Sequence, residues 1–362
     1  MRVIQLTSSS AGGVARHARQ VASLLSATKR VLLAGPPDVV AGATVPTRIV
    51  DIADRPRLRD LVALCRLRVL ARDAHILHAH GLRAGAAAVL ATRLLPHRPA
   101  VVVTLHNLPV GGATLQRIAG VLEVICARGA DVVLGVSGDL VARAAARGAR
   151  GARRALVPAP ARPRTSGVDL GDLRREVGVA PGEALILTVG RLAPQKGLDL
   201  LCDAARRLGE TGAQPLRWVV VGDGPLAPDL RERIAQEQLP IALLGPRDDV
   251  ADLMVAADVV VSTSTWEGQP LVVQEALQVG AAIVATDVGG TAEVTGSAAE
   301  LVAADGAALA AGISAVLADP ERHDELRRAA AERAARLPGP AEVVAQLNEI
   351  YDEAHGARGA AR

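Results

Sequence analysis

The feature that most constrains the fold is an alternation, along all 362 residues, of short β-branched runs with longer segments rich in Ala, Leu and Arg. Such alternation is typical of parallel sheets whose strands are connected by helices. Helices are predicted at residues 14–25, 58–70 and 84–94 of the first half. The predicted strands are residues 3–6, 30–34, 75–78, 101–105 and 131–136, then residues 185–189, 218–221, 241–244, 259–261 and 282–285.

The two runs of alternation are separated by residues 157–167, a stretch rich in Pro, Arg and Gly that indicates a linker. A chain of this length suits two domains, each with its own core. We therefore predict an α/β protein with two Rossmann-like domains, residues 1–165 and 166–340, and a cleft between them. Residues 341–362 are predicted to form a helix as far as Tyr351 and then a ragged, disordered end, packed back toward the first domain.

Composition restricts the core and the compartment. The chain has no Phe, one Tyr and two Trp, so its core must consist of Val, Leu, Ile and Ala. The three cysteines lack the paired spacing of a zinc site or a disulfide framework, which favours buried thiols in a reducing compartment. No apolar stretch reaches the roughly 20 residues of a membrane span, and the first residues do not resemble a signal peptide. We expect a cytoplasmic protein.

Charge is divided unevenly along the chain. Residues 1–165 carry 24 Arg and Lys against 8 Asp and Glu, whereas the remaining residues carry 17 against 30. The first domain is therefore expected to meet something anionic, such as an acidic acceptor or the inner face of a membrane. The alternative is an Arg-rich codon bias on solvated faces, although that bias would act on both halves alike. Nucleic acid is not an expected partner.

A diphosphate site is predicted after the strand at residues 185–189. The turn that follows contains Gly190, Arg191 and Lys196, and a helix begins at about Leu198. Glycines, two cations and a helix amino end together favour an anion, because free N–H groups and the helix dipole both attract negative charge. Lysine is rare in this chain, with only two of 41 basic residues. The alternative is a pair of surface cations beside a turn.

A second candidate segment runs from Glu267 to Glu275, around the start of another predicted helix. Two carboxylates can accept hydrogen bonds from paired hydroxyls, as a sugar and a ribose present them. Pro is compatible with a helix start, so Glu275 is expected on the helix, about two turns beyond Glu267. Spacing alone proves little, and both side chains could merely cap or decorate the helix. The residues expected to line a donor between the carboxylates are Gly268, Gln269, Pro270, Leu271 and Val272.

Two weaker candidates lie in the first domain. The turn that contains Gly12 and Gly13 could place N–H groups over the other side of a diphosphate, or be an ordinary strand-to-helix turn. His106 follows the predicted strand 101–105, where a neutral imidazole could bind a sugar hydroxyl or serve structure alone. His78 and His80 lie at a similar strand end, and for them a structural role is favoured.

Several segments together resemble one family. These are VGRLAPQKGLDLL, VVVGDGP, LGPRDDV, STSTWEGQPLVVQEAL and ATDVGGTAEV in the second half, with GGVARH, HAHG and TLHN in the first. In order and spacing they resemble the retaining, nucleotide-sugar-dependent glycosyltransferases of family 4, also called group 1, which have the GT-B fold. Gln269 departs from the resemblance, because members usually carry an aromatic or other apolar residue there.

The resemblance implies roles for the candidate residues. Arg191 and Lys196 would neutralise the departing diphosphate, Glu267 would hold donor-sugar hydroxyls and Glu275 the ribose. Gly13 would approach the β-phosphate. His106 would touch the donor sugar, and the loop around Arg247 would lie near the nucleobase.

The expected activity is therefore transfer of a sugar from a nucleotide diphosphate sugar to an acceptor such as a lipid, a glycan or an anionic small molecule. The resemblance implies retention of configuration, and we expect no cofactor besides the nucleotide sugar substrate. We also expect no metal, because Asp248 and Asp249 are adjacent rather than spaced as a metal-binding pair. Two alternatives remain open: a nucleotide-sugar epimerase on the same fold, and a non-catalytic protein that binds membranes. A dehydrogenase is disfavoured because no GxGxxG opens the first helix.

Overall fold

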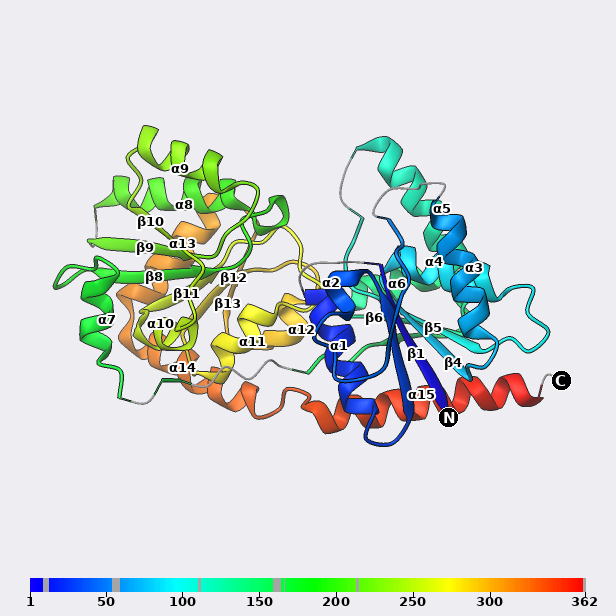
Figure 1. The fold of residues 1–362 in the computed structure, drawn as a ribbon. Helices are drawn as coiled ribbons and strands as arrows, with labels where there is room; N and C mark the ends of the chain where they lie inside the picture. The colour runs from blue at the N-terminus through cyan, green and yellow to red at the C-terminus, as the bar shows by residue number, and fades with distance from the viewer. Residues whose placement is uncertain are drawn as a thin grey trace. The chain divides into compact units, whose positions relative to one another are not determined.

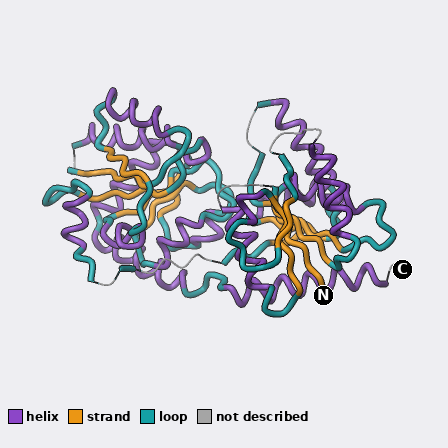
Figure 2. Tube along the Cα trace, in the orientation of Figure 1, coloured by secondary structure: helices purple, strands orange, loops and turns teal. Residues whose placement is uncertain are grey.

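The protein is described here from a computed structural model (Figure 1). It describes residues 1–8, 13–53, 59–109, 112–158, 164–165, 167–212 and 215–360. The chain divides into two compact units. Unit 1 comprises residues 1–158 with residues 338–362, and unit 2 comprises residues 159–337. Strands lie inside each unit and helices surround them (Figure 2).

Unit 1 is built on a parallel sheet with the strand order β3-β2-β1-β4-β5-β6-β7. The interior strands are mostly apolar, as expected for parallel strands covered on both faces, although β1 and β4 also carry the buried polar side chains Gln5, His78 and His80. The strands are β1 (Arg2–Thr7), β2 (Arg30–Gly35), β3 (Thr47–Ile49), β4 (Ile76–His80), β5 (Ala100–Leu105), β6 (Val132–Gly135) and β7 (Ala152–Arg154).

The helices of unit 1 lie on both faces of this sheet. Crossovers between parallel strands are right-handed, and the strand order reverses direction at β1. The helices that follow β3, β4, β5 and β6 therefore share one face, opposite the helix that follows β1. They are α1 (Gly13–Leu25), α2 (Pro37–Val40), α3 (Arg59–Ala71), α4 (Leu82–Thr92), α5 (Ala113–Gly129), α6 (Gly138–Ala146) and α15 (Pro340–Ala360).

Unit 2 repeats the plan with a parallel sheet in the order β10-β9-β8-β11-β12-β13. The order reverses between β8 and β11, and the carboxyl ends of strands at such a switch point are where ligands bind in open α/β sheets. The strands are β8 (Ala184–Val189), β9 (Leu216–Val221), β10 (Ile241–Gly245), β11 (Val259–Ser262), β12 (Ile283–Thr286) and β13 (Glu300–Val302).

Two apolar clusters cover the faces of the unit 2 sheet, one on each side. Trp218 is fully buried in the first cluster and satisfies its indole by donating a hydrogen bond to Thr188 Oγ1 over 3.0 Å. The helices are α7 (Leu170–Glu176), α8 (Leu198–Thr211), α9 (Ala227–Gln236), α10 (Val250–Ala256), α11 (Leu271–Gln278), α12 (Thr291–Thr295), α13 (Gly306–Ala318) and α14 (Pro320–Ala334), with a short 3₁₀ helix η1 (Pro194–Lys196).

The ten strands and three helices predicted from the sequence are all confirmed, with ends that differ by one or two residues. The ragged end predicted after Tyr351 is wrong, because α15 continues to Ala360. The cause is packing on unit 1. Tyr351 and Ala354 are buried, and Arg358 forms an ion pair with Asp131 at 2.7 Å. Among the described residues, no helix has the length and apolarity to cross a membrane.

Candidate functional site

The predicted phosphate turn of unit 2 lies directly after β8, at the switch point of the sheet. Its backbone is held by the strand beside it: Thr265 N–H donates to Gln195 O over 2.9 Å, and Thr263 Oγ1 donates to Lys196 O over 2.8 Å. Gly197 adopts a φ of 60°, and a Cβ there would lie 2.0 Å from Thr263 O. A glycine is therefore required where the turn enters α8.

Lys196 and Glu267 form the charged centre of this site. Lys196 Nζ lies 2.5 Å from Glu267 Oε1, and Ser264 Oγ donates to the same oxygen over 2.7 Å. The two charged side chains are 23% and 14% exposed, so the pair is largely shielded but reachable. The ammonium extends past Gly190, where a Cβ would lie 3.5 Å from Lys196 Cε. The structure thus brings Gly190, Lys196 and Glu267 together.

The main chain at Glu267 is fixed from the next strand as well. Gly290 N–H donates to Glu267 O over 2.8 Å. Gly289 has a φ of 54°, and a Cβ there would lie 2.0 Å from the same oxygen. The loops after β11 and β12 therefore hold the main chain of Glu267 in a defined position.

Helix α11 begins beyond this carboxylate. Gly268 and Pro270 are buried, while Gln269, Leu271 and Val272 are half-buried. Pro270 precedes the helix and provides no side-chain cap, so the first N–H groups of α11 can meet a ligand's negative charge. Glu275, one turn further into α11, is only 3% exposed.

Arg191 and Arg247 lie differently from Lys196. Arg191 is exposed at the start of the turn. Arg247 follows β10, and its guanidinium binds Asp249 at 2.6 Å and Glu176 at 2.9 Å. Hydrogen bonding to Asp249 raises the pKa of Arg247 and lowers that of Asp249. The Arg247 side chain therefore holds the loop, which leaves backbone groups for any ligand nearby.

The main chain of the loop after β9 lies close to that of the phosphate turn. Gly222 has a φ of 135°, and a Cβ there would lie 1.9 Å from Gly190 O. A Cβ at Gly224 would lie 2.3 Å from Leu192 O. The loop after β9 therefore packs its main chain directly on the phosphate turn, which side chains at these glycines would prevent.

His106 lies in unit 1, directly after β5, within a cluster of imidazoles. His80 Nδ1 lies 3.2 Å from His106 Nε2, and the His17 ring contacts both, with centroids 5.5 Å from His80 and 5.2 Å from His106. Gly13 is the first residue of α1, the helix that carries His17. Gly12 lies outside the described residues.

A chain of hydrogen bonds fixes which nitrogen of His106 carries a proton. Gln5 Oε1 can only accept, so the 2.7 Å contact requires a proton on His80 Nε2. In a neutral ring, His80 Nδ1 must then accept from His106 Nε2–H. His106 consequently presents Nδ1 as a hydrogen-bond acceptor, suited to a ligand hydroxyl.

The same chain continues to the C-terminal helix. Gln5 Nε2 donates to the Tyr351 hydroxyl over 2.9 Å, and that hydroxyl shares a hydrogen bond with His78 Nδ1 over 2.6 Å. His78 Nε2 shares another with Thr104 Oγ1 over 2.7 Å. The three strands β1, β4 and β5 and helix α15 are therefore tied together behind His106.

Burial keeps these imidazoles neutral. It lowers the pKa of His17 to about 4 and, with the neighbouring His17, that of His78 to about 3. Burial, with neighbouring imidazoles, holds the pKa of His80 and His106 well below the usual range. All four rings are thus hydrogen-bonding groups rather than charges at neutral pH.

Three of the rings could also hold a metal ion. His17, His80 and His106 each offer one ring nitrogen, and these atoms lie within 4.8 Å of one another. Against a cation, no carboxylate of the described residues contributes to the pKa shift of any of the three. His17 also lies near the amino end of α1, which carries partial positive charge. The electrostatics therefore favour a neutral or anionic ligand.

The fold and the unit 2 turn together define a protein of the GT-B class. The family model described as "Glycosyl transferases group 1" matches residues 171–333, and that described as "Glycosyl transferase 4-like domain" matches residues 12–160. Between them the two models take in most of both units. The chain belongs to the group 1 glycosyltransferases of the GT-B fold.

Relatives of known name match parts of the chain. A UDP-Gal:alpha-D-GlcNAc-diphosphoundecaprenol alpha-1,3-galactosyltransferase of Escherichia coli is 33% identical over 128 residues, 34% of this chain and 33% of that protein. The alpha-maltose-1-phosphate synthase of Mycolicibacterium smegmatis is 32% identical over 195 residues, 49% of each chain. The matched segments thus span half or less of these relatives.

Solved structures match over the whole fold. HepE of Anabaena, in complex with UDP-glucose, superposes with a TM-score of 0.81 at 22% identity, covering 98% of this chain and 100% of that one. A sucrose-phosphate synthase of Thermosynechococcus elongatus gives 0.76 at 21% identity, covering 99% and 100%. At these identities the likeness establishes the fold.

Sequence reasoning missed four residues of these sites: Ser264, Gln5, Tyr351 and His17, which it quoted only within the segment GGVARH. Ser264 lies in the same segment as Glu267, and its hydroxyl donates to that carboxylate. A hydroxyl three residues before a carboxylate is the sequence feature that could have indicated this contact. Gln5 is a polar residue inside the apolar run of β1, and Tyr351 is the one tyrosine of the chain. A buried amide inside a strand requires a partner, which was the signal for Gln5.

Proposed function

We propose that this protein transfers a sugar from a nucleotide diphosphate sugar to an acceptor, with retention of configuration and without a metal ion. One observation carries the proposal: Lys196 and Glu267 meet at the switch point of the unit 2 sheet, where α11 also directs its first N–H groups. A cation, a carboxylate and a helix amino end are the groups that a diphosphate and a sugar require.

In this proposal, donor binding separates the Lys196–Glu267 ion pair. The ammonium turns to the diphosphate, and the carboxylate accepts hydrogen bonds from sugar hydroxyls. Arg191, exposed beside them, adds a second cation. Breaking the glycosyl bond places negative charge on the diphosphate, and prearranged cations stabilise that charge where other enzymes use a metal.

Glu275 and the Arg247 loop are proposed to hold the nucleoside, and His106 Nδ1 to accept a hydrogen bond from a sugar hydroxyl. UDP sugars are the first donors to test, since the E. coli relative is named for UDP-Gal and HepE was solved with UDP-glucose. The acceptor is proposed to be a lipid, a glycan or an anionic small molecule that meets the basic unit 1 in the cytoplasm. Retention is tested by NMR of the product anomer, and an inverted anomer would exclude it.

Thermal shift with UDP sugars tests donor binding, because a ligand of the folded state raises its apparent stability. UDP-glucose and UDP-galactose are compared with UDP alone in the wild type and in Lys196→Ala. We expect a rise in melting temperature that the variant loses. No shift with any nucleotide sugar at millimolar concentration would reject the proposal. Conversion of a donor to its epimer without acceptor would indicate an epimerase instead.

A further inference from the structure

Exposed aliphatic side chains are concentrated on neighbouring helices of unit 1. Among the described residues, ten large hydrophobic side chains are exposed and none of them belongs to unit 2. Two, Met1 and Ile49, lie elsewhere in unit 1. The other eight form what we call the aliphatic surface: Leu61, Val62 and Val69 on α3, Leu90 and Leu94 at the end of α4, and Leu115, Ile118 and Val121 on α5.

The pattern on α5 is the reverse of an ordinary surface helix. A helix that packs on a core normally turns its larger apolar residues inward. On α5 the buried positions hold Ala119, Glu123, Cys126 and Ala127, whereas Leu115, Ile118 and Val121 are exposed at intervals of three residues. Such a stripe is expected where another apolar phase covers the helix.

The three helices form one layer. Helix α4 contacts both α3 and α5, and all three follow strands whose crossovers place them on the same face of the sheet. Figure 1 shows them side by side. The residues of the aliphatic surface are therefore exposed on adjacent helices of one layer.

Positive charge accompanies the aliphatic surface. A hollow of about 770 Å³ between α5 and α6 is lined by Val121 and by the guanidinium groups of Arg117, Arg143 and Arg147. The buried Glu123 carboxylate forms ion pairs with two of them, with Arg143 Nε at 2.6 Å and with Arg147 Nε at 3.1 Å. One carboxylate thus faces three guanidinium groups, and the hollow keeps a positive excess.

The rest of the layer shows the same excess. Asp60, the acidic residue of α3, is paired with Arg83 at 2.9 Å. Arg66, Arg72 and Arg128 are exposed on or beside the same helices.

We infer that the aliphatic surface, with the arginines of the α5–α6 hollow, docks on a membrane that contains anionic phospholipid. Aliphatic side chains enter the acyl boundary while guanidinium groups meet lipid phosphates. A second copy of this chain fits less well, because it would bring the same positive charge against itself.

This inference deepens the proposed meeting of unit 1 with an anionic partner, but its test requires neither donor nor transfer. The full-length protein is sedimented with vesicles of phosphatidylcholine alone and of phosphatidylcholine with phosphatidylglycerol. We expect binding to the anionic vesicles that weakens as salt is raised. The combined variant Leu115→Gln, Ile118→Gln and Val121→Gln should lower the partition coefficient about tenfold or more.

A matched pair of single variants controls for solubility. Val121, which is 61% exposed, and Ile49, which is 51% exposed, differ in whether they belong to the aliphatic surface. Val121→Gln should weaken vesicle binding and Ile49→Gln should not. Arg117→Gln should weaken binding only to anionic vesicles.

Three outcomes would overturn the inference. The first is no sedimentation with anionic vesicles, and the second is equal binding by the triple variant and the wild type. The third is a concentration-dependent dimer that the triple variant abolishes, which would assign the surface to a second copy. If the wild-type protein bound anionic vesicles but no nucleotide sugar, the proposed function alone would be rejected.

Discussion

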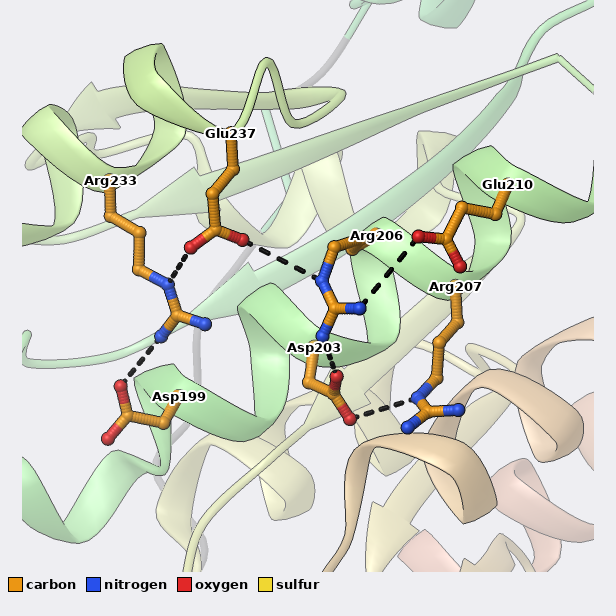
Figure 3. A network of polar contacts seen from close by, with 7 residues as sticks. All are labelled: Asp199, Asp203, Arg206, Arg207, Glu210, Arg233 and Glu237. Carbon is orange, nitrogen blue, oxygen red and sulfur yellow. Dashed lines mark hydrogen bonds and ion pairs between the residues drawn. The ribbon is translucent and has the colours of Figure 1, made fainter.

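The two units share a sheet plan but differ in what they leave on their surfaces. Unit 2 keeps its large aliphatic residues at least partly buried and carries 17 basic against 26 acidic residues. Three of its arginines are paired with carboxylates on or beside α8 and α9 (Figure 3). The network joins Arg206, Arg207 and Arg233 to Asp199, Asp203, Glu210 and Glu237.

Unit 1 carries 24 basic against 12 acidic residues, so many of its guanidinium groups lack an acidic counterpart. The candidate sites differ in the same sense. Unit 2 offers an ion pair, Lys196 with Glu267, and unit 1 offers neutral imidazoles around His106. Unit 2, whose surface charges are largely paired with one another, suits the binding of one small ligand. Unit 1, with unpaired positive charge and exposed aliphatic side chains, suits contact with a larger anionic surface.

The largest expected effect tests the charged site. Lys196→Ala removes the ammonium proposed to stabilise the leaving diphosphate, and transfer should fall about 100- to 1,000-fold. Steady-state rates with a UDP sugar measure the loss. The chain offers a matched control, because its one other lysine is Lys29 in unit 1. Lys29→Ala should leave the rate near that of the wild type.

Glu275→Ala should also reduce transfer strongly, through loss of donor affinity. If both Lys196→Ala and Glu275→Ala retained near wild-type transfer, the assignment of the site to unit 2 would be wrong.

The fold was more predictable than the sites. Interior strands are mostly apolar runs, so the sequence marked each of them, but β3, β7 and β13 have three residues each and are only partly buried. Such short edge strands carry little periodicity, and none was predicted. The end of α15 was missed for a related reason: the helix is stabilised by contacts with distant segments, such as Arg358 with Asp131, which no local pattern records.

Within the sites, the sequence indicated residue types but not their partners. Gly190 and Lys196 were placed correctly beside one turn, because strand ends and helix starts are local features. The Lys196–Glu267 contact joins residues 71 positions apart, and the Gln5–Tyr351 contact joins residues 346 apart. Those pairings depend on tertiary packing.

A second prediction sharpens the contrast between the units through pH. The pKa of His17 and that of His78 are lowered by burial to about 4 and about 3. An unfolded His has a pKa near 6.5, so the unfolded state binds more protons below that pH and the stability of unit 1 falls with acidification. Between pH 6 and pH 5 these two residues should cost about 2 kcal/mol together.

The chain carries its own reporters for this measurement. Both tryptophans, Trp218 and Trp266, lie in unit 2, and the one tyrosine, Tyr351, lies in unit 1. Urea unfolding at pH 6 and pH 5, followed separately by tryptophan fluorescence and by the tyrosine signal, should show the tyrosine transition moving to lower urea by more than the tryptophan transition. Equal movement of both would mean that the buried imidazoles do not set the acid sensitivity of unit 1.

A smaller effect is expected from the hydrogen-bond chain behind His106. Gln5→Leu removes the acceptor that keeps the proton on His80 Nε2, so His106 loses its fixed tautomer and transfer should fall about tenfold. Nitrogen NMR of the imidazoles should show His106 protonated at Nε2 in the wild type and mixed in the variant. Gln346→Leu is the matched control, since Gln346 also makes two hydrogen bonds in unit 1, with Leu156 and Arg154.

The smallest expected effect concerns metal, and it separates the two candidate sites most sharply. If cations of unit 2 stabilise the leaving diphosphate, removing divalent ions with a chelator should leave the transfer rate unchanged. The imidazoles of His17, His80 and His106 lie close enough to bind zinc, so the same experiment tests unit 1. If chelation abolished activity, and zinc restored it in the wild type but not in His17→Gln, an ion bound in unit 1 would be the group that stabilises the leaving diphosphate. An unchanged rate would leave the imidazoles as neutral hydrogen-bonding groups, because a catalytic ion bound to them could not be removed without effect.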